Sequence, residues 1–225
     1  MPTNSGSPVW AKGKHMLVRY RVNRLGIRCV PPNYGFFDRF TPGEVAIDVG
    51  VGDDPDFSLY LVKNYGMECF AVDPTRKHAS KLQQIEHEVP LFHYLPCALG
   101  ADDGTVEFCE STINVSGSLL EGHRNVVEDP CIRYDVEMVS LESLVAQIGR
   151  EPIGILKMDT EGAEYGIISQ MGKATLSKIR QLMVEFHHGT VEGITWHDTA
   201  LAIRTIEKLG MKSFVYNGRD CLFYW

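Results

Sequence analysis

From residue 44 onward, short apolar runs alternate with segments whose apolar residues recur at helical spacing. Strands are expected at 45–49, 69–73, 91–99, 154–159 and 181–187, and helices at 56–66, 77–88, 141–148, 163–171 and 197–210. Strands that alternate with helices of about a dozen residues are typical of a parallel sheet covered by helices on both faces. The alternation therefore predicts an α/β fold with a doubly wound, mostly parallel sheet.

The end of the chain departs from this alternation. The apolar run 213–216, the pair Asn217 and Gly218, and the run 221–225 predict an antiparallel β-hairpin, because Asn-Gly suits a tight turn with positive φ. Two further strands, 105–110 and 134–140, are expected around a loop rich in serine and glycine. The sequence has no repeat and no low-complexity linker. We therefore expect a single domain, with an N-terminal cap segment at 1–43 and a cofactor-binding body at 44–225.

The charge of the chain limits the classes of partner. With 29 acidic and 22 basic residues, the formal net charge is −7, which argues against a broad nucleic-acid-binding face. A local basic rim stays open, because basic side chains gather in the first thirty residues: Lys12, Lys14, Arg19, Arg21, Arg24 and Arg28.

The sequence predicts a cytoplasmic protein without membrane contact. The polar N-terminal residues precede no apolar signal segment, and no apolar run approaches the roughly 20 residues of a membrane span. The six cysteines are scattered and form no C-x-x-C pair, which favours a reducing compartment over a disulfide or zinc framework.

The stretch AIDVGVGDDPDF, residues 46–57, joins an apolar strand to a helix through paired glycines. The dinucleotide fingerprint G-x-G-x-x-G has a third glycine, but Pro55 occupies that position here. Asp53 and Asp54 also place negative charge where a pyrophosphate lies. The turn therefore favours a cofactor without phosphates, such as S-adenosylmethionine, and the alternative is an ordinary tight turn. Asp73 supports a cofactor, since a carboxylate ending the next strand can accept hydrogen bonds from both ribose hydroxyls.

Six motifs then point to a family. In order along the chain they read DVGVG, FAVDPT, ALGADDGTVEF, VEMVSLESL, ILKMDTEGAE and MVEFHH. With them the chain resembles the FkbM-like family of class I S-adenosylmethionine-dependent methyltransferases over about residues 44–188. The resemblance implies a seven-stranded sheet with a reversed last strand, and methyl transfer to a hydroxyl, often of a sugar or natural product. The family's turn often reads D-x-G-A-N-x-G, whereas this chain has Gly52, Asp53 and Asp54 after Val51.

The turn, the end of the second strand and the resemblance together give a set of expected cofactor contacts. The class I layout implies that Cys97 and Ala98 neighbour the adenine, and the family implies that the loop holding Ser118 approaches the cofactor or the acceptor. The expected cofactor-binding residues are Asp48, Val49, Gly50, Gly52, Asp73, Pro74, Cys97, Ala98, Ser118 and Asp159.

Three residues are expected to be catalytic. By resemblance, Asp159 and Glu161 lie at the junction of cofactor and substrate, although Glu161 also suits a helix N-terminus, where it opposes the dipole. His187 is a natural base for a hydroxyl near neutral pH. Alternation along the strand puts Glu185 on the same face as His187, so that Asp159, Glu185 and His187 form a possible divalent metal site. No metal is predicted as the main interpretation.

Two other classes of function compete with methyl transfer to oxygen. A short-chain NAD-dependent oxidoreductase needs a Tyr-x-x-x-Lys pair, and no tyrosine here has a lysine four residues later. A cofactor-binding domain without catalysis, or methylation of nitrogen, stays open. The acceptor is expected to be a small molecule or sugar shaped by loop 111–133 and by the aromatic residues of the cap: Trp10, Tyr20, Tyr34, Phe36 and Phe37. Pro31 to Tyr34 lies before the first strand and is not read as an amino-methyltransferase motif. The sequence assigns no oligomeric state.

Overall fold

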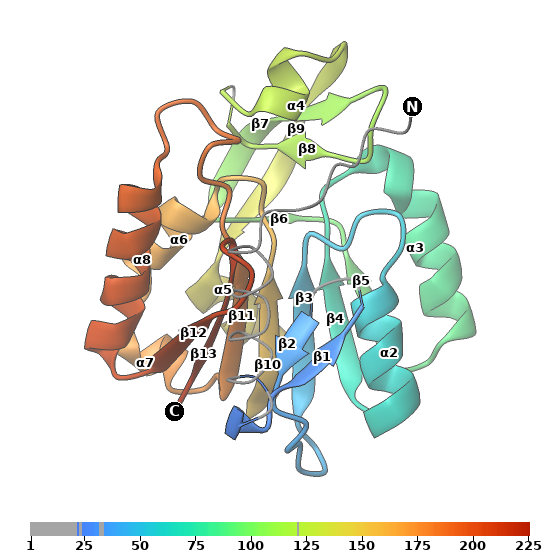
Figure 1. Ribbon diagram of the computed structural model, residues 1–225. Coiled ribbons are helices and arrows are strands. Elements are labelled where there is room, and N and C mark those ends of the chain that lie inside the picture. The colour runs from blue at the N-terminus through green and yellow to red at the C-terminus, as the bar shows by residue number, and fades with distance from the viewer. Residues whose placement is uncertain (1–21, 23, 32–33, 121) are drawn as a thin grey trace, which may run out of the picture.

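The computed structural model of the 225-residue chain describes residues 22, 24–31, 34–120 and 122–225 (Figure 1). A seven-stranded sheet in the order β12-β13-β11-β10-β3-β4-β5 forms its centre. Its strands are β3 (Val45–Val49), β4 (Glu68–Val72), β5 (Phe92–Leu95), β10 (Ile153–Met158), β11 (Gln181–Glu185), β12 (Lys212–Val215) and β13 (Asp220–Tyr224). The first five run parallel, while β13 pairs antiparallel with both β11 and β12. The predicted doubly wound sheet with a reversed C-terminal hairpin is confirmed.

Helices cover the two faces of this sheet because neighbouring strand residues point to opposite sides. Ile47, Leu156 and Val184 belong to one core cluster, which packs against α5 (Leu141–Ile148), α6 (Glu164–Gln170) and α8 (Trp196–Leu209). On the other face, α2 (Asp56–Tyr65) and α3 (Arg76–Glu88) pack over the strands (Figure 1). Two single-turn helices, α4 (Arg124–Val127) and α7 (Lys173–Leu176), lie in connections.

The N-terminal segment covers part of the same face as α2. Its two short strands, β1 (Arg28–Val30) and β2 (Tyr34–Phe36), pair antiparallel. Phe36 is fully buried in a cluster with residues of α2 and the sheet. The backbone of Phe37 is tied to strand β11, because its N–H donates to Gln181 Oε1 at 2.7 Å and its carbonyl accepts from Gln181 Nε2 at 2.9 Å. Phe36 and Phe37 thus hold the segment against the sheet, and the predicted Trp10 and Tyr20 lie outside the described residues.

A second sheet, in the order β6-β9-β7-β8, lies beside the carboxyl ends of the central strands (Figure 1). It comprises β6 (Ala98–Gly100), β7 (Gly104–Ser111), β8 (Gly117–Ser118) and β9 (Cys131–Ser140). The sequence predicted one strand over 91–99, but the structure ends β5 at Leu95 and starts β6 at Ala98. Pro96 explains the break, because proline has no backbone N–H to continue the ladder. The chain crosses there from one sheet to the other.

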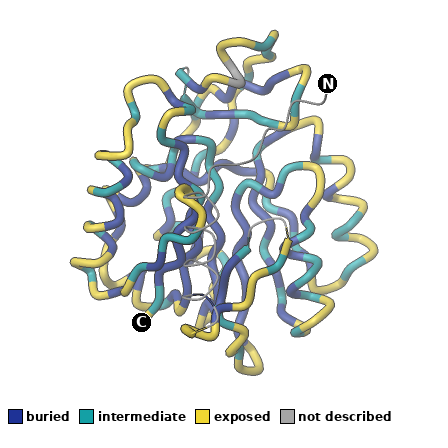
Figure 2. Tube along the Cα trace, viewed as in Figure 1, coloured by how far each residue is buried: buried dark blue, intermediate teal, exposed yellow. Residues whose placement is uncertain are grey.

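Burial follows this arrangement. Figure 2 shows the central strands as buried and the outer helix surfaces and connections as exposed. The six cysteines are all free thiols. Among the described residues, no helix combines the length and the apolar character that crossing a membrane requires.

Candidate active site

The paired-glycine turn follows β3 and closely approaches the end of β10. A Cβ on Gly50, whose φ is +74°, would lie 1.8 Å from the backbone oxygen of Asp159. The Gly50 N–H donates to Val72 O at 2.9 Å, and the Asp159 N–H donates to Val49 O at 3.2 Å. Only glycine combines this positive φ with room for the neighbouring backbone. The turn therefore fixes the carboxyl ends of three adjacent strands against one another.

Asp73 lies at the end of β4 and is held by two backbone donors. Its Oδ2 accepts from Gly52 N at 2.8 Å, and its Oδ1 accepts from Thr75 N at 2.8 Å. Its backbone oxygen accepts from the Tyr94 hydroxyl at 3.0 Å. A carboxylate offers about four acceptor positions, so each oxygen keeps capacity for one further donor. The Asp73 carboxylate is thus held in place, and both of its oxygens can accept a further hydrogen bond.

A cavity of about 260 Å³ opens between the glycine turn, the end of β10 and the second sheet. Most of the predicted cofactor residues line it: Asp48, Val49, Gly50, Gly52, Asp73, Pro74, Ala98 and Asp159. Several residues outside the predicted cofactor set also line the cavity: Tyr34, Thr75, Leu99, Phe108, Ser116, Gly117 and Lys157. Leu99 and Phe108 lie within the motif ALGADDGTVEF, and Ser116 and Gly117 lie in the loop that holds Ser118, so these two signals could have identified them.

Two predicted cofactor residues are not among those that line the cavity. Cys97 is 6% exposed and packs in the main core cluster. Ser118 donates from Oγ to the backbone oxygen of Glu161 at 2.9 Å and accepts from Leu120 N at 3.0 Å. Ser118 therefore supports the loop after β10 from behind the cavity wall.

The mouth of the cavity is acidic, as the sequence predicted. Asp53, Asp54 and Asp56 all line it. The hydroxyl of Tyr34 donates to Asp56 Oδ1 at 2.8 Å, which brings the N-terminal segment to the same wall. Carboxylates at a helix N-terminus oppose a phosphate group. This mouth suits a cationic or phosphate-free ligand.

Lys157 is a buried cation that the sequence analysis did not identify. It is 6% exposed, and its Nζ lies 3.4 Å from Asp48 Oδ1 and 3.5 Å from Asp159 Oδ2. The Nζ also donates to the Gly50 carbonyl at 3.3 Å. Lys157 therefore joins the ends of β3 and β10 by charge. A lysine inside the otherwise apolar run GILKM was the available signal.

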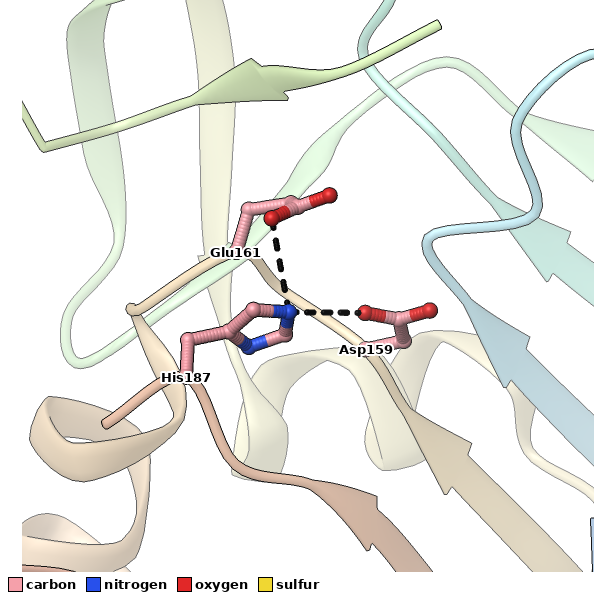
Figure 3. Close-up of side chains that lie close together, drawn as sticks. All are labelled: Asp159, Glu161 and His187. Atoms are coloured by element: carbon pink, nitrogen blue, oxygen red, sulfur yellow. Dashed lines mark ion pairs between the residues drawn. The ribbon is translucent and has the colours of Figure 1, made fainter. Parts of the chain in front are cut away.

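Asp159, Glu161 and His187 converge at the carboxyl ends of β10 and β11 (Figure 3). His187 Nε2 lies 3.5 Å from Asp159 Oδ1 and 3.3 Å from Glu161 Oε2. On the other side of the ring, Nδ1 lies 3.2 Å from Glu164 Oε1, which also accepts from the His187 backbone N–H at 2.8 Å. Glu164 is fully buried and receives a further bond from Gly162 N. We call Asp159, Glu161 and His187 the acid–imidazole cluster.

The loop after β10 holds Glu161 in an uncommon backbone conformation. With φ at 50°, Glu161 is the one non-glycine residue of positive φ among the described parts of the chain. Such a conformation costs of order 1–3 kcal/mol and persists where surrounding contacts impose it. Here those contacts include the Ser118 Oγ bond to the Glu161 carbonyl and the Ser116 Oγ bond to its side chain at 3.2 Å. The side chain is thereby directed toward His187.

The charged groups of this cluster shift one another's pKa values. Burial lowers the pKa of His187, but the Glu164 hydrogen bond and the Asp159 and Glu161 charges outweigh burial and raise that pKa to about 9. Burial raises the pKa of Asp159 to about 6, against the lowering effect of Lys157. Burial also raises the pKa of Glu161, but His123 and His187 outweigh it and lower that pKa. The cluster thus favours a positive charge at His187, between the two carboxylates.

His123 adds a second imidazole from the loop between β8 and β9. Its side chain is fully buried, with Nε2 2.7 Å from Glu161 Oε2 and its ring centroid 6.1 Å from that of His187. The predicted alternative ligand Glu185 is absent from the group of convergent ligand atoms in the described chain, and Glu161 takes its place. Glu161 and Asp159 line the cavity, whereas His187 lies behind them.

Comparison with known proteins agrees with the sequence motifs. The chain is 25% identical over 156 residues to 2-O-methyltransferase NoeI of Sinorhizobium fredii (strain NBRC 101917 / NGR234), across 64% of this chain and 64% of that protein. The match thus spans slightly less than two thirds of the relative's length.

Two solved structures have a loosely similar fold. Aeropyrum pernix fibrillarin with natively bound S-adenosyl-L-methionine is 8% identical, over 80% of this chain and 65% of that chain, with a TM-score of 0.45. The N-terminal domain of human METTL16 in complex with SAH is 8% identical, over 99% and 73%, with a TM-score of 0.45. The Methyltransferase FkbM domain matches residues 47–212, which is well over half of the chain. The protein belongs to the FkbM methyltransferase family, as its motifs predicted.

Proposed function

We propose that this protein binds S-adenosylmethionine and transfers its methyl group to a hydroxyl of a small molecule or sugar. The observation that carries the proposal is the Asp73 carboxylate, held at the cavity wall by the N–H groups of Gly52 and Thr75. Both oxygens keep acceptor capacity for a ribose diol. Membership of the FkbM family supports the same reaction class.

The donor set of the cavity fits such a cofactor. Ala98, Leu99 and Phe108 offer an apolar wall for a planar base. Asp53 and Asp54 put negative charge at the mouth, which suits a sulfonium and an ammonium group and opposes a pyrophosphate. Together with Asp73, these residues would hold the adenosine and methionine parts of the cofactor.

The acid–imidazole cluster supplies groups for the acceptor. S-adenosylmethionine, when bound, supplies a methyl carbon on a positively charged sulfur. The acceptor oxygen would take that methyl carbon, with S-adenosylhomocysteine as the departing thioether. Asp159 lines the cavity and takes the hydroxyl proton in this proposal, since a base within reach is what an alcohol needs. His187 lies behind the wall, so we give it the role of holding Asp159 and Glu161 in position.

The proposed acceptor class rests on the similarity to NoeI and on the residues that line the cavity. NoeI is named a 2-O-methyltransferase, and its 25% identity to this chain supports methylation of a hydroxyl. Tyr34 lines the cavity and its ring lies 5.9 Å from Lys157 Nζ. An aromatic face at the wall suits a sugar or planar ring. Loop residues 115–119 of the second sheet line the same cavity in part.

The test is calorimetric titration of the full chain with S-adenosylhomocysteine, with NAD as the comparison ligand. We expect micromolar binding of S-adenosylhomocysteine, a loss of at least tenfold in affinity in Asp73→Asn, and no change in Asp102→Asn. Asp102 is exposed and does not line this cavity, so it controls for the loss of one charge. NAD binding, or equal S-adenosylhomocysteine affinity in Asp73→Asn, would contradict the proposal.

Binding alone does not separate an enzyme from a cofactor-binding domain without catalysis. We therefore pair the titration with a screen of hydroxylated and amine acceptors, following methyl transfer by mass. Methyl transfer to hydroxyl compounds supports the proposal. Transfer to amines only would assign nitrogen methylation, and cofactor binding without any transfer would favour a regulatory domain.

A further inference from the structure

We infer that Asp159, Glu161 and His187 form a binding site for one divalent transition-metal ion at the edge of the cofactor cavity, with His123 holding Glu161 in position. The ion's role in methyl transfer rests on the proposed function, whereas its binding does not. The ligand atoms of Asp159, Glu161 and His187 lie within 4.8 Å of one another. His123 approaches the same Glu161 oxygen that faces His187.

The first argument is the direction of the His187 ring. Glu164 Oε1 lies 3.2 Å from Nδ1 and is itself fixed by backbone donors, so Nδ1 carries the proton toward Glu164. Carboxylates bonded to the far nitrogen of a metal-binding histidine fix its tautomer in this way. The Nε2 lone pair then points at Asp159 and Glu161. That arrangement needs a positive centre between the nitrogen and the two carboxylates.

The second argument is distance. Nε2 lies 3.5 Å and 3.3 Å from the two carboxylate oxygens, which is longer than the roughly 2.7–2.9 Å of a charge-assisted N–H···O bond. Two ligands at about 2.1 Å from one ion, at angles between square and tetrahedral, are separated by about 3.0–3.4 Å. The observed spacing fits ligands of a shared ion better than it fits a direct ion pair.

The third argument is the support that His123 gives to Glu161. Its side chain is fully buried, and its Nε2 lies 2.7 Å from Glu161 Oε2, the distance of a charge-assisted hydrogen bond. The backbone holds the ring in place, since Arg124 N donates to Thr190 O and Glu192 N to Gly122 O. A carboxylate ligand fixed by a buried neighbour is typical of metal sites, where such outer partners orient the ligands.

The charge balance agrees. Lys157 pairs with Asp48 and Asp159, whereas Glu161 and Glu164 pair with the His187 ring. These four carboxylates exceed the single ammonium, and a divalent ion compensates the excess while the His187 imidazole stays neutral, as metal ligation demands. Mixed imidazole and carboxylate ligands favour Mn²⁺, Fe²⁺ or Zn²⁺ over Mg²⁺ or Ca²⁺.

Such an ion bears on the acceptor because only part of its surroundings is protein. Asp159 and Glu161 line the cavity while the imidazoles lie behind them, so the open side of the ion faces the cavity. Catalytic metal sites keep an open position of this kind. An acceptor hydroxyl that occupies it is oriented toward the methyl group and loses its proton more easily.

The test uses Mn²⁺ binding to the chelator-treated full chain, followed by the electron paramagnetic resonance signal of free Mn²⁺. We expect one ion per chain, at least a tenfold loss of affinity in Glu161→Gln and in His123→Gln, and wild-type binding in His93→Gln. His93 is a part-exposed histidine paired with Glu68 on β4, and it controls for the loss of an imidazole. Mg²⁺ in tenfold excess is expected to displace little Mn²⁺.

Several results would overturn the inference. Absence of Mn²⁺ binding to the wild-type chain overturns it outright, whatever the variants do. Loss of binding in Glu185→Gln, with Glu161→Gln unaffected, replaces the ligand set with the one that includes Glu185. A parallel titration with S-adenosylhomocysteine keeps the two proposals apart: cofactor binding without Mn²⁺ binding removes only the metal site, and the reverse removes only the cofactor assignment.

Discussion

Replacing Gly50 by alanine tests the closest approach in the site. Gly50 has a φ of +74°, and an added Cβ would lie 1.8 Å from Asp159 O. Positive φ costs an L-residue about 1–2 kcal/mol, and forcing two packed backbones apart costs typically about 1–3 kcal/mol more. We expect Gly50→Ala to lower the free energy of unfolding by about 2–5 kcal/mol, a large part of the roughly 5–15 kcal/mol of an ordinary domain.

Gly52→Ala is the matched control for this substitution. Gly52 has a φ of +63°, but a Cβ there meets nothing within 4 Å. We therefore expect Gly52→Ala to cost only the backbone term of about 1–2 kcal/mol. Urea unfolding followed by circular dichroism measures both values, and titration with S-adenosylhomocysteine measures affinity where the variant folds. Equal costs for the two variants would refute the inference that the strand ends approach so closely.

Two further perturbations address buried charge. Lys157→Met removes the cation between Asp48 and Asp159, and we expect it to lower the free energy of unfolding by about 3–5 kcal/mol. The control Lys178→Met breaks a part-exposed pair with Glu151 and should lower it by about 1 kcal/mol or less. Similar losses in the two variants, measured by chemical unfolding, would contradict the buried charge pairing. Burial raises the pKa of Asp220 to about 7, above its value in the unfolded chain. As pH rises, the folded chain therefore keeps this proton longer than the unfolded chain does. The free energy of unfolding then falls as pH rises from about 4 to 7. Asp220→Asn removes that fall. The difference in unfolding free energy between the variant and the wild type should therefore shift in favour of the variant by about 1–3 kcal/mol from pH 5 to pH 8. A difference that does not depend on pH would count against the raised pKa.

The sequence predicted the central architecture because its signals are local. Apolar runs, glycine helix ends such as Gly66, and the Asn217–Gly218 turn each act within a few residues. The residues of the cavity wall were largely predictable for the same reason, since Gly50 and Asp73 directly follow their strands. Parallel strands then bring these ends to one edge of the sheet.

What the sequence did not predict depends on pairing between distant segments. Lys157 lies beside Asp48 because the pairing of β10 with β3 places these two residues opposite each other. His123 reaches Glu161 through a loop held by backbone bonds to residues 190–192. The surroundings of His187 are another such effect, because three carboxylates from the segment after β10 meet its ring and favour positive charge there. Such effects arise from tertiary packing and leave no periodic trace in the sequence.

The second sheet has a consequence for how this enzyme family can diversify. Its strands come from one uninterrupted stretch of chain, 98–140, which supplies Phe108, Ser116 and Gly117 to the cavity wall. The glycine turn and Asp73 lie outside that stretch. Insertions or exchanges at the exposed tip between β7 and β8 therefore change one part of the cavity wall while the glycine turn and Asp73 stay intact. The shape of the cavity can thus vary through one loop, independently of the two turns that follow β3 and β4.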